Sequence, residues 1–265
     1  MNAGDAGLLQ AQCILNTRPA HQLAGLSALL QASGAEVIEF PVIEIVATEP
    51  TAFHLNLAQN LEHYDIALFV SRNAVDGAFH FIGKHDLPDH LQLAVIGEGT
   101  YLALSEHEPD LERRLIRAHP YHSEALLAAT ALQQVAEKKI LIFRGQQGRN
   151  LLGDVLRQRG AQVRYCEVYR RQLPDYDSDF YRSLSAGRKP TLVVFTSSEG
   201  MYNAVKLVDD EARQDLLNIP WLLISERMRE PAVNLGHNAA IIIAADASNE
   251  GIQQAICEWT IEQSI

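Results

Sequence analysis

Residues 140–171, ILIFRGQQGRNLLGDVLRQRGAQVRYCEVYRR, decide the fold, because they repeat residues 14–45 at a constant distance of 126 positions. The pairs that match at this offset include Ile14/Ile140, Leu15/Leu141, Arg18/Arg144, Leu26/Leu152, Leu30/Leu156 and Gly34/Gly160. The same offset places Phe69 on Phe195 and Ser71 on Ser197, and an offset of 128 places Val95 on Leu223. A register that covers several strand-to-helix units indicates an internal duplication with short insertions.

Each copy has the pattern of a buried strand, a polar loop, a helix, a glycine and a second strand. Leucines at helical spacing precede Gly34 and Gly160, and glycine suits the left-handed end of a helix. Further short apolar runs, at residues 66–70, 91–96, 192–195, 221–224 and 239–244, predict more strands, and residues 124–136 predict one helix. Strands that alternate with helices predict an α/β protein with parallel sheets in two halves.

Composition and charge exclude several classes of protein. At 265 residues the chain exceeds one typical domain, and 47% apolar with 21% charged residues is ordinary for a globular protein. The longest apolar run, residues 239–245, is far below the ~20 residues of a membrane helix, and the first twelve residues contain no Lys or Arg. The net charge of −11 disfavours nucleic acid and anionic membranes as partners. We therefore expect a cytoplasmic protein that binds a small molecule.

Glycine and polar residues follow the predicted strands, where parallel sheets bind ligands. These residues are Thr17 and Arg18; Ser71, Arg72 and Asn73; Gly97 to Thr100; Arg144 and Gly145; Thr196, Ser197 and Ser198; and Ser225 to Met228. Backbone N–H groups and helix dipoles at helix starts favour carboxylates or phosphates. For any single loop, ordinary helix capping is the better explanation, but six such loops in two copies favour an anion-binding site.

Two side-chain types in these regions have alternative interpretations. Arg18 and Arg144 occupy equivalent positions, where a guanidinium could bind a carboxylate or could pair with a neighbouring acidic residue. Tyr169 falls where the first copy has Ile43. A strand tyrosine is usually an amphipathic filler, although a phenol in a cleft between domains could donate a proton to a leaving oxygen.

Other chemistries lack support in the sequence. Residues 97–102, GEGTYL, have Leu102 where a dinucleotide fingerprint needs a third small residue, and residues 145–150, GQQGRN, lack the Lys-Ser/Thr end of a Walker loop. His119 and His122 form the only close histidine pair and are predicted to lie in a surface loop rather than in a metal site. Three cysteines without CxxC spacing argue against zinc or a disulfide framework.

Several blocks together, in order and over almost the whole chain, resemble the uroporphyrinogen-III synthase family. They are TRP, GAEVIEFPVIEI, DIALFVSRNAV, AVIGEGT, ILIFRGQQGRNLL, RGAQVRYCEVYRR and VVFTSSEGM. The resemblance implies two Rossmann-like or flavodoxin-like parallel-sheet domains joined by a two-stranded β connector. Residues 1–40 and 173–265 would then form one domain, 48–164 the other, and 41–47 with 165–172 the connector.

The resemblance also implies a reaction. Members of that family are lyases that cyclise hydroxymethylbilane, a linear tetrapyrrole with eight carboxylates, to uroporphyrinogen III, with inversion of ring D and loss of water. Neither a metal nor an organic cofactor is implied, and we expect a monomer. Tyr169 matches the family's tyrosine proposed to assist hydroxyl loss, and Thr100 matches its threonine after the glycine turn.

The expected binding residues combine the strand-end loops with this resemblance. They are Arg18, Ser71, Asn73, Gly97, Thr100, Arg144, Gly145, Ser197 and Ser198, with Tyr169 as the catalytic residue. Residues 225–228, SERM, depart from the family pattern of Gly and Thr, which puts a binding role there in doubt. Two alternatives from other classes are a non-catalytic sensor of an anionic metabolite and a flavin-binding electron carrier.

Overall fold

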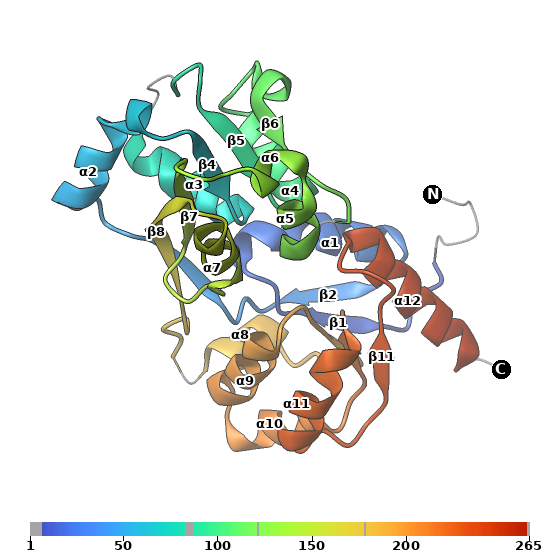
Figure 1. Ribbon diagram of the computed structural model, residues 1–265. Coiled ribbons are helices and arrows are strands. Elements are labelled where there is room, and N and C mark those ends of the chain that lie inside the picture. Colours follow the sequence, from blue (N-terminus) through green and yellow to red (C-terminus); the bar gives the residue numbers. More distant parts are fainter. Residues whose placement is uncertain (1–6, 83–86, 121, 178, 264–265) are drawn as a thin grey trace. The chain divides into compact units, whose positions relative to one another are not determined.

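The computed structural model describes residues 7–82, 87–120, 122–177 and 179–263, which divide into two compact units. The first unit comprises the described residues up to Glu44 and from Gln172 onward, and the second comprises Ile45–Arg171. Each unit contains one sheet with helices around it (Figure 1). Among the described residues, no helix combines the length and apolarity that crossing a bilayer requires.

The sheet of the first unit has five parallel strands in the order β11-β10-β9-β1-β2. The strands are β1 (Cys13–Asn16), β2 (Glu36–Glu39), β9 (Leu192–Phe195), β10 (Trp221–Leu223) and β11 (Ile241–Ile243). The helices are α1 (Ala20–Ala32), α8 (Phe180–Ser185), α9 (Ser198–Leu207), α10 (Asp210–Leu217), the 3-10 turn η3 (Glu226–Met228), α11 (Arg229–Asn234) and α12 (Asn249–Glu262).

Alternate residues of these strands face opposite sides of the sheet, and both sides are covered. Ile14, Val194 and Leu222 pack against α1 and α12, which lie side by side in Figure 1. Trp221 points to the other side, where its indole N–H donates to the Leu216 carbonyl of α10 at 2.8 Å. Burial on both faces explains why the strands are continuous apolar runs rather than alternating ones.

The second unit has a six-stranded sheet in the order β3-β8-β7-β4-β5-β6. The strands are β3 (Glu44–Ala47), β4 (Ile66–Phe69), β5 (Gln92–Val95), β6 (Leu115–Ile116), β7 (Lys139–Gly145) and β8 (Gln162–Gln172). The helices are α2 (Ala52–Ala58), η1 (Leu61–His63), α3 (Arg72–Ile82), α4 (Glu98–Ser105), η2 (Leu111–Arg114), α5 (Ser123–Ala128), α6 (Thr130–Gln133) and α7 (Leu151–Gln158). Ala67 and Phe69 face α3 and α4, whereas Ile66 and Leu68 face α5, α6 and α7.

The hydrogen-bond registers of the two sheets repeat the sequence offset. Ile14 pairs with Leu192 in the first unit, and Ile140 pairs with Ile66 in the second, so both partners are related by 126 positions. Cys13 likewise pairs with Glu36 in the first unit and Lys139 with Gln162 in the second, again with both partners 126 positions apart. The strand order of the first unit, read from β2, is the flavodoxin order 2-1-3-4-5. The second unit has the circularly permuted arrangement from β8 to β6, because β7 and β8 come after β4 to β6 in the chain, and β3 is added at the edge. The predicted duplication and the parallel α/β class are therefore confirmed.

One predicted element was wrong. Residues 124–136 do not form a single helix, because Ala129 is extended (φ −61°, ψ 135°) between α5 and α6. The Arg159 guanidinium donates to the Leu127 carbonyl, just before the break, at 2.7 Å and to the Leu132 carbonyl, in the last turn of α6, at 2.8 Å. A side chain distant in sequence thus stabilises a break that the local helical pattern does not reveal.

The predicted connector involves β3 and β8, which are neighbours in the sheet of the second unit. That residues 41–47 and 165–172 join two domains stays a prediction. The predicted first domain, 1–40 and 173–265, includes residues 1–6, 178 and 264–265, which lie outside the described part of the chain.

Candidate active site

The predicted loops gather at one edge of each sheet, because parallel strands end on the same side. In the second unit β7, β4 and β5 are neighbours, and the residues that end or follow them are Arg144 and Gly145, Ser71, and Gly97. In the first unit β1 and β9 are neighbours, and Arg18 and Ser197 follow them. The sequence prediction therefore gives one set of candidate groups in each unit.

Tyr169 reaches this edge of the second unit. Its hydroxyl lies 3.3 Å from the Ser71 hydroxyl, and its ring packs in the core with Phe69 and Phe143 at 5% exposure. The Tyr169 ring therefore has the packing role that is usual for a tyrosine in a strand. The hydroxyl is the part of Tyr169 that contacts a polar group following β4.

A β-bulge sets the position of Tyr169. The register between β7 and β8 shifts after Arg144, so that Gly145 pairs with Tyr169 instead of Val168. The Gln146 N–H then donates to the Tyr169 carbonyl at 3.0 Å. A Cβ on Gly145 would lie 2.7 Å from two carbons of the Tyr169 ring, so only glycine fits beneath this ring without displacement.

The serines at the strand ends are helix caps, as the alternative interpretation held. The Ser71 hydroxyl accepts from the Ala74 N–H at 3.2 Å, and the Ser197 hydroxyl accepts from the Gly200 N–H at 3.0 Å. A hydroxyl that accepts at a cap still has its own hydrogen to donate. Asn73 and Ser198 lie in the first turns of α3 and α9 and are partly exposed.

Gly97 and Thr100 form the turn into α4. Gly97 has a φ of 87°, which favours glycine, and among the described residues beyond its chain neighbours no heavy atom lies within 4 Å of the position that a Cβ would take. The buried Thr100 hydroxyl donates to the Ile96 carbonyl at 2.6 Å. Its hydrogen is therefore used inside the turn, and the side chain orders the loop.

The two equivalent arginines are buried, and Arg144 donates to its own loop. Arg144 donates from Nε to the Gly145 carbonyl at 3.1 Å, from Nη1 to Asn150 Oδ1 at 2.8 Å and from Nη2 to the Gly148 carbonyl. Its guanidinium carbon also lies 4.6 Å from the centre of the Tyr165 ring. Among the described residues, no carboxylate lies within ion-pair distance of Arg144.

Arg18 makes contacts of the same kind in the first unit. It donates to Asn249 Oδ1 and to the Ala247 carbonyl, the latter at 2.9 Å, and its Nε is buried without a partner. Burial lowers the pKa of the Arg18 guanidinium. The ion pair with a neighbouring acid, which was the alternative for both arginines, is absent from the described residues around Arg18 as well.

Arg144 also lines a pocket of about 240 Å³ in the second unit. The remaining lining residues are Val70, Ile96, His122, Ser123, Glu124, Ile142, Gly148, Arg149, Leu152 and Tyr165. His122, predicted to lie in a surface loop, is exposed and precedes α5, and only its place in the pocket lining was not predicted. His122 caps α5 by accepting from the Ala125 N–H at 3.1 Å, and the polar residues that follow it were the available signal.

The described residues contain no group of three or more His, Cys, Asp or Glu side chains arranged to hold a metal ion. Cys13, Cys166 and Cys257 are buried.

Comparison with known proteins identifies the family. A family model described as uroporphyrinogen-III synthase HemD matches residues 24–254. The uroporphyrinogen-III synthase of Escherichia coli is 32% identical over 249 residues, covering 92% of this chain and 99% of that protein. The chain belongs to the uroporphyrinogen-III synthase family. The Salmonella typhimurium synthase is 33% identical over 247 residues, with 92% and 99% coverage.

Solved structures of uroporphyrinogen-III synthases have the same fold. The Helicobacter pylori structure gives a TM-score of 0.64 at 13% identity and covers 94% of this chain and 99% of its own. A Thermus thermophilus mutant gives 0.59 at 16% identity, with 95% and 99% coverage. At these identities the likeness supports the fold alone. Family membership confirms the predicted synthase function and does not favour the anion-sensor alternative.

Proposed function

We propose that this member of the family cyclises hydroxymethylbilane to uroporphyrinogen III, and that the Tyr169–Ser71 hydroxyl pair starts the reaction. The pair lies at the carboxyl edge of a parallel sheet, which is where such sheets bind ligands. This pair is the observation that carries the mechanistic proposal.

The first step is loss of the substrate hydroxyl. Tyr169 donates its proton to Ser71 while Ser71 donates its own to the departing oxygen, so that the carbon–oxygen bond breaks and water leaves. Ser71 is partly exposed and Tyr169 is buried, so a relay through Ser71 brings the phenol proton to the strand edge. Proton transfer by a positioned side chain typically contributes about 10²–10⁴-fold in rate.

The later steps need positioning rather than further catalytic groups. Loss of the hydroxyl as water leaves an azafulvenium cation, which the substituted carbon of ring D attacks to form a spiro intermediate. The intermediate fragments and recloses in the inverted sense, and the proton released at the end restores the phenol. Because the substrate can close by itself to the uninverted isomer, holding the productive pose is the main task of the protein.

Donors at the strand edges are proposed to bind the substrate carboxylates. In the second unit these are the Ser71 hydroxyl, the Asn73 amide, and backbone N–H groups of the turns that begin at Gly97 and Gly145. Thr100 and Arg144 order those turns, and Arg144 with Arg149 supplies positive charge to the pocket of about 240 Å³. In the first unit, Arg18, Ser197 and Ser198 are proposed carboxylate-binding groups as well.

Three further properties complete the proposal. We infer that the reaction needs no metal or organic cofactor, since acid-assisted loss of the hydroxyl and positioning suffice, and that the protein is a cytoplasmic monomer. Full activity after exhaustive dialysis against a chelator, and a mass near 29.4 kDa by light scattering, are the expected results.

The deciding experiment is an isomer-resolved assay. The purified chain is supplied with hydroxymethylbilane, and the oxidised products are separated chromatographically. Uroporphyrinogen III should predominate over the uninverted isomer. A product consisting of the uninverted isomer alone would contradict the proposal.

A further inference from the structure

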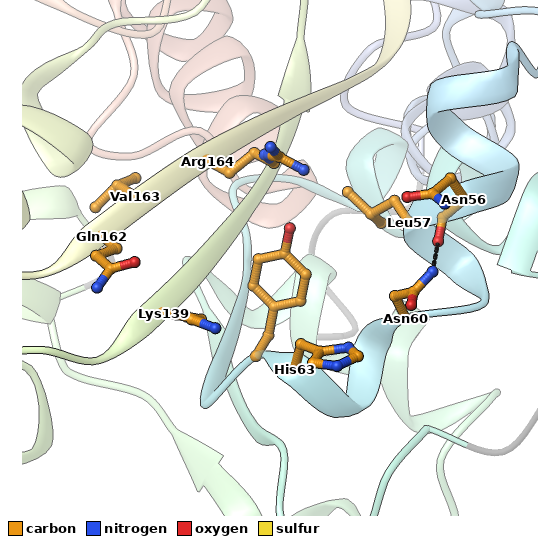
Figure 2. Close-up of a pocket in the computed structure, with 9 residues that line it drawn as sticks. Asn56, Leu57, Asn60, His63, Lys139, Gln162, Val163 and Arg164 are labelled. Atoms are coloured by element: carbon orange, nitrogen blue, oxygen red, sulfur yellow. Dashed lines mark hydrogen bonds between the residues drawn. The ribbon is translucent and has the colours of Figure 1, made fainter.

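The second unit contains another hollow, at the opposite end of its sheet from the candidate active site. It has a volume of about 500 Å³ and is lined by Lys139 and residues 162–164 from the starts of β7 and β8, and by Asn56, Leu57, Asn60, His63 and Tyr64 from the α2–η1 segment. Figure 2 shows the labelled side chains of Lys139 and Gln162 across from those of Asn56 and Asn60. β7 is seven residues long, so its two ends are roughly 20 Å apart at the usual rise of a strand.

The lining is cationic and rich in hydrogen-bond donors. Lys139 and Arg164 supply two positive charges, and the described lining residues include three amide side chains but no carboxylate. Within the described part of the chain, no acidic group lies within ion-pair distance of either cation. The neighbouring Asp65 carboxylate accepts from the backbone N–H of Lys139 at 2.7 Å and does not line the hollow.

The first unit provides an internal comparison. Its hollow has a volume of about 270 Å³ and is lined partly by residues between 181 and 190. The 126-residue offset relates Lys189 and Pro190 of this hollow to His63 and Tyr64 of the larger one. There two of the three lining cations are paired with carboxylates, and the third, Arg188, donates to the backbone carbonyls of Ser185 and Leu184. Arg182 pairs with Asp209 at 2.7 Å and with Glu211 at 3.3 Å, and Lys189 pairs with Asp215 at 3.4 Å.

Among the described residues, the partly equivalent hollow of the first unit therefore contains counter-charges, and the larger hollow of the second unit contains none. A net charge of −11 gives the chain ample acidic residues, so a hollow whose described lining carries two cations and no carboxylate is a local exception. Arg164 is oriented by the Phe53 ring, 5.6 Å from its guanidinium carbon, which leaves its planar fork available to an oxyanion.

We propose that the hollow formed by Lys139, Arg164 and the α2–η1 segment binds a small organic polyanion, distinct from the tetrapyrrole site. Lys139 and Arg164 contact its carboxylate or phosphate groups, and Asn56, Asn60 and Gln162 bind its remaining oxygens. The proposal does not depend on the relay through Tyr169, because none of its residues belongs to that machinery.

Calorimetric titration of the full chain tests the proposal, with citrate as the carboxylate probe and inorganic pyrophosphate as the phosphate probe. We expect saturable binding of at least one probe in a 1:1 ratio with a Kd below about 1 mM. The two titrations distinguish carboxylate from phosphate chemistry. Absence of saturable binding by both probes would overturn the proposal.

A matched pair of double variants locates the site. Lys139→Gln with Arg164→Gln removes the unpaired cations, and Arg182→Gln with Lys189→Gln removes the same charge from the hollow of the first unit. The first should weaken binding at least 10-fold and the second less than 2-fold, and equal losses would show a nonspecific charge effect and refute the site. Lys139 and Arg164 are exposed, so thermal unfolding and synthase turnover without probe should match the parent, and Lys139→Gln alone offers a milder variant.

Discussion

The hydroxyl of Tyr169 lies 3.3 Å from the hydroxyl of Ser71, although 98 positions separate the two residues. Tyr169 belongs to β8 and Ser71 follows β4, with β7 between these strands. Two strand spacings amount to roughly 10 Å, so the tyrosine ring has to extend across β7. It does so at Gly145, the residue of β7 that has no side chain. The bulge and Gly145 therefore allow the Tyr169 ring to extend across β7 to Ser71.

Replacing Tyr169 by Phe tests the proton donor. The ring packing remains and only the hydroxyl is lost, so we expect turnover to fall about 10²–10⁴-fold with a small change in the unfolding temperature. The isomer-resolved assay and thermal unfolding provide the two readouts. Tyr165→Phe is the matched control, because Tyr165 lies on the same strand and its hydroxyl donates only to the Asn150 carbonyl, at 3.2 Å. Near-parent turnover of Tyr169→Phe would remove the acid role.

Ser71→Ala tests the relay. If the proton passes through Ser71, this variant should lose nearly as much turnover as Tyr169→Phe, and the double variant should lose little more than either single one, because groups that act as a unit are not additive. Loss of the cap also costs about 1 kcal/mol of stability, which denaturant unfolding measures separately.

Ser71→Thr retains a hydroxyl at the same position and should restore most of the turnover. Fully additive losses in the double variant would mean that Tyr169 and Ser71 act independently.

Gly145→Ala tests the arrangement beneath the Tyr169 ring. A Cβ 2.7 Å from two ring carbons forces the ring or the bulge to move, so we expect a loss of about 1–3 kcal/mol in unfolding free energy together with reduced turnover. Gly99→Ala is the control for stability, because nothing lies within 4 Å of its Cβ position and Gly99 is helical. It should be neutral or up to about 1 kcal/mol more stable. Equal stability of the two variants would contradict the packing argument.

Features of this structure that depend on neighbouring residues can be predicted from the sequence, whereas features that depend on contacts between residues far apart in the sequence cannot. The duplication, the parallel strands and the strand-end loops are carried by local apolar periodicity and by the offset, and the strand registers confirm them at Ile14 and Ile140. The helix break at Ala129 depends on Arg159, some thirty positions away, and local periodicity contains no trace of it. The synthase assignment rests on the resemblance and on family membership.

The candidate site was predictable as a set of residues but not as a set of contacts. That Ser71 and Ser197 cap helices follows from residue type. Residue type does not predict that Arg144 donates to its own loop, because an arginine after a strand can also form an ion pair or bind a ligand. The bulge had one signal in the sequence: apolar Val168 and Tyr169 are adjacent in a strand whose exposure otherwise mostly alternates.

Arg144→Gln tests whether the loop after β7 supports substrate binding. Three guanidinium nitrogens hold the carbonyls of Gly145 and Gly148 and the amide of Asn150, so the substitution loosens the turn whose N–H groups are proposed to bind carboxylates. We expect KM to rise at least 10-fold with a smaller change in kcat. Arg157→Gln is the control, since Arg157 also lies over the Tyr165 ring, at 5.0 Å, but is exposed and holds no part of the loop. An unchanged KM in Arg144→Gln would exclude this role.

Cys166 gives the protein a pH dependence of known sign. Burial, with a smaller contribution from the Glu167 charge, raises the pKa of its thiol from 9.0 to about 12. Because the folded-state pKa is raised, the neutral thiol contributes stability that is fully present below pH 9 and is lost as the pH rises toward 12.

Urea unfolding between pH 7 and pH 11 should show a steeper alkaline decline for the parent than for Cys166→Ala. The variant is less stable at pH 7, because it leaves a small cavity in the core with Phe143, so the two curves should approach each other above pH 9. Tyr181, whose pKa burial also raises to about 12, is present in both proteins and contributes equally. Parallel curves across this range would mean that the thiol ionises as readily in the folded chain as in the unfolded one.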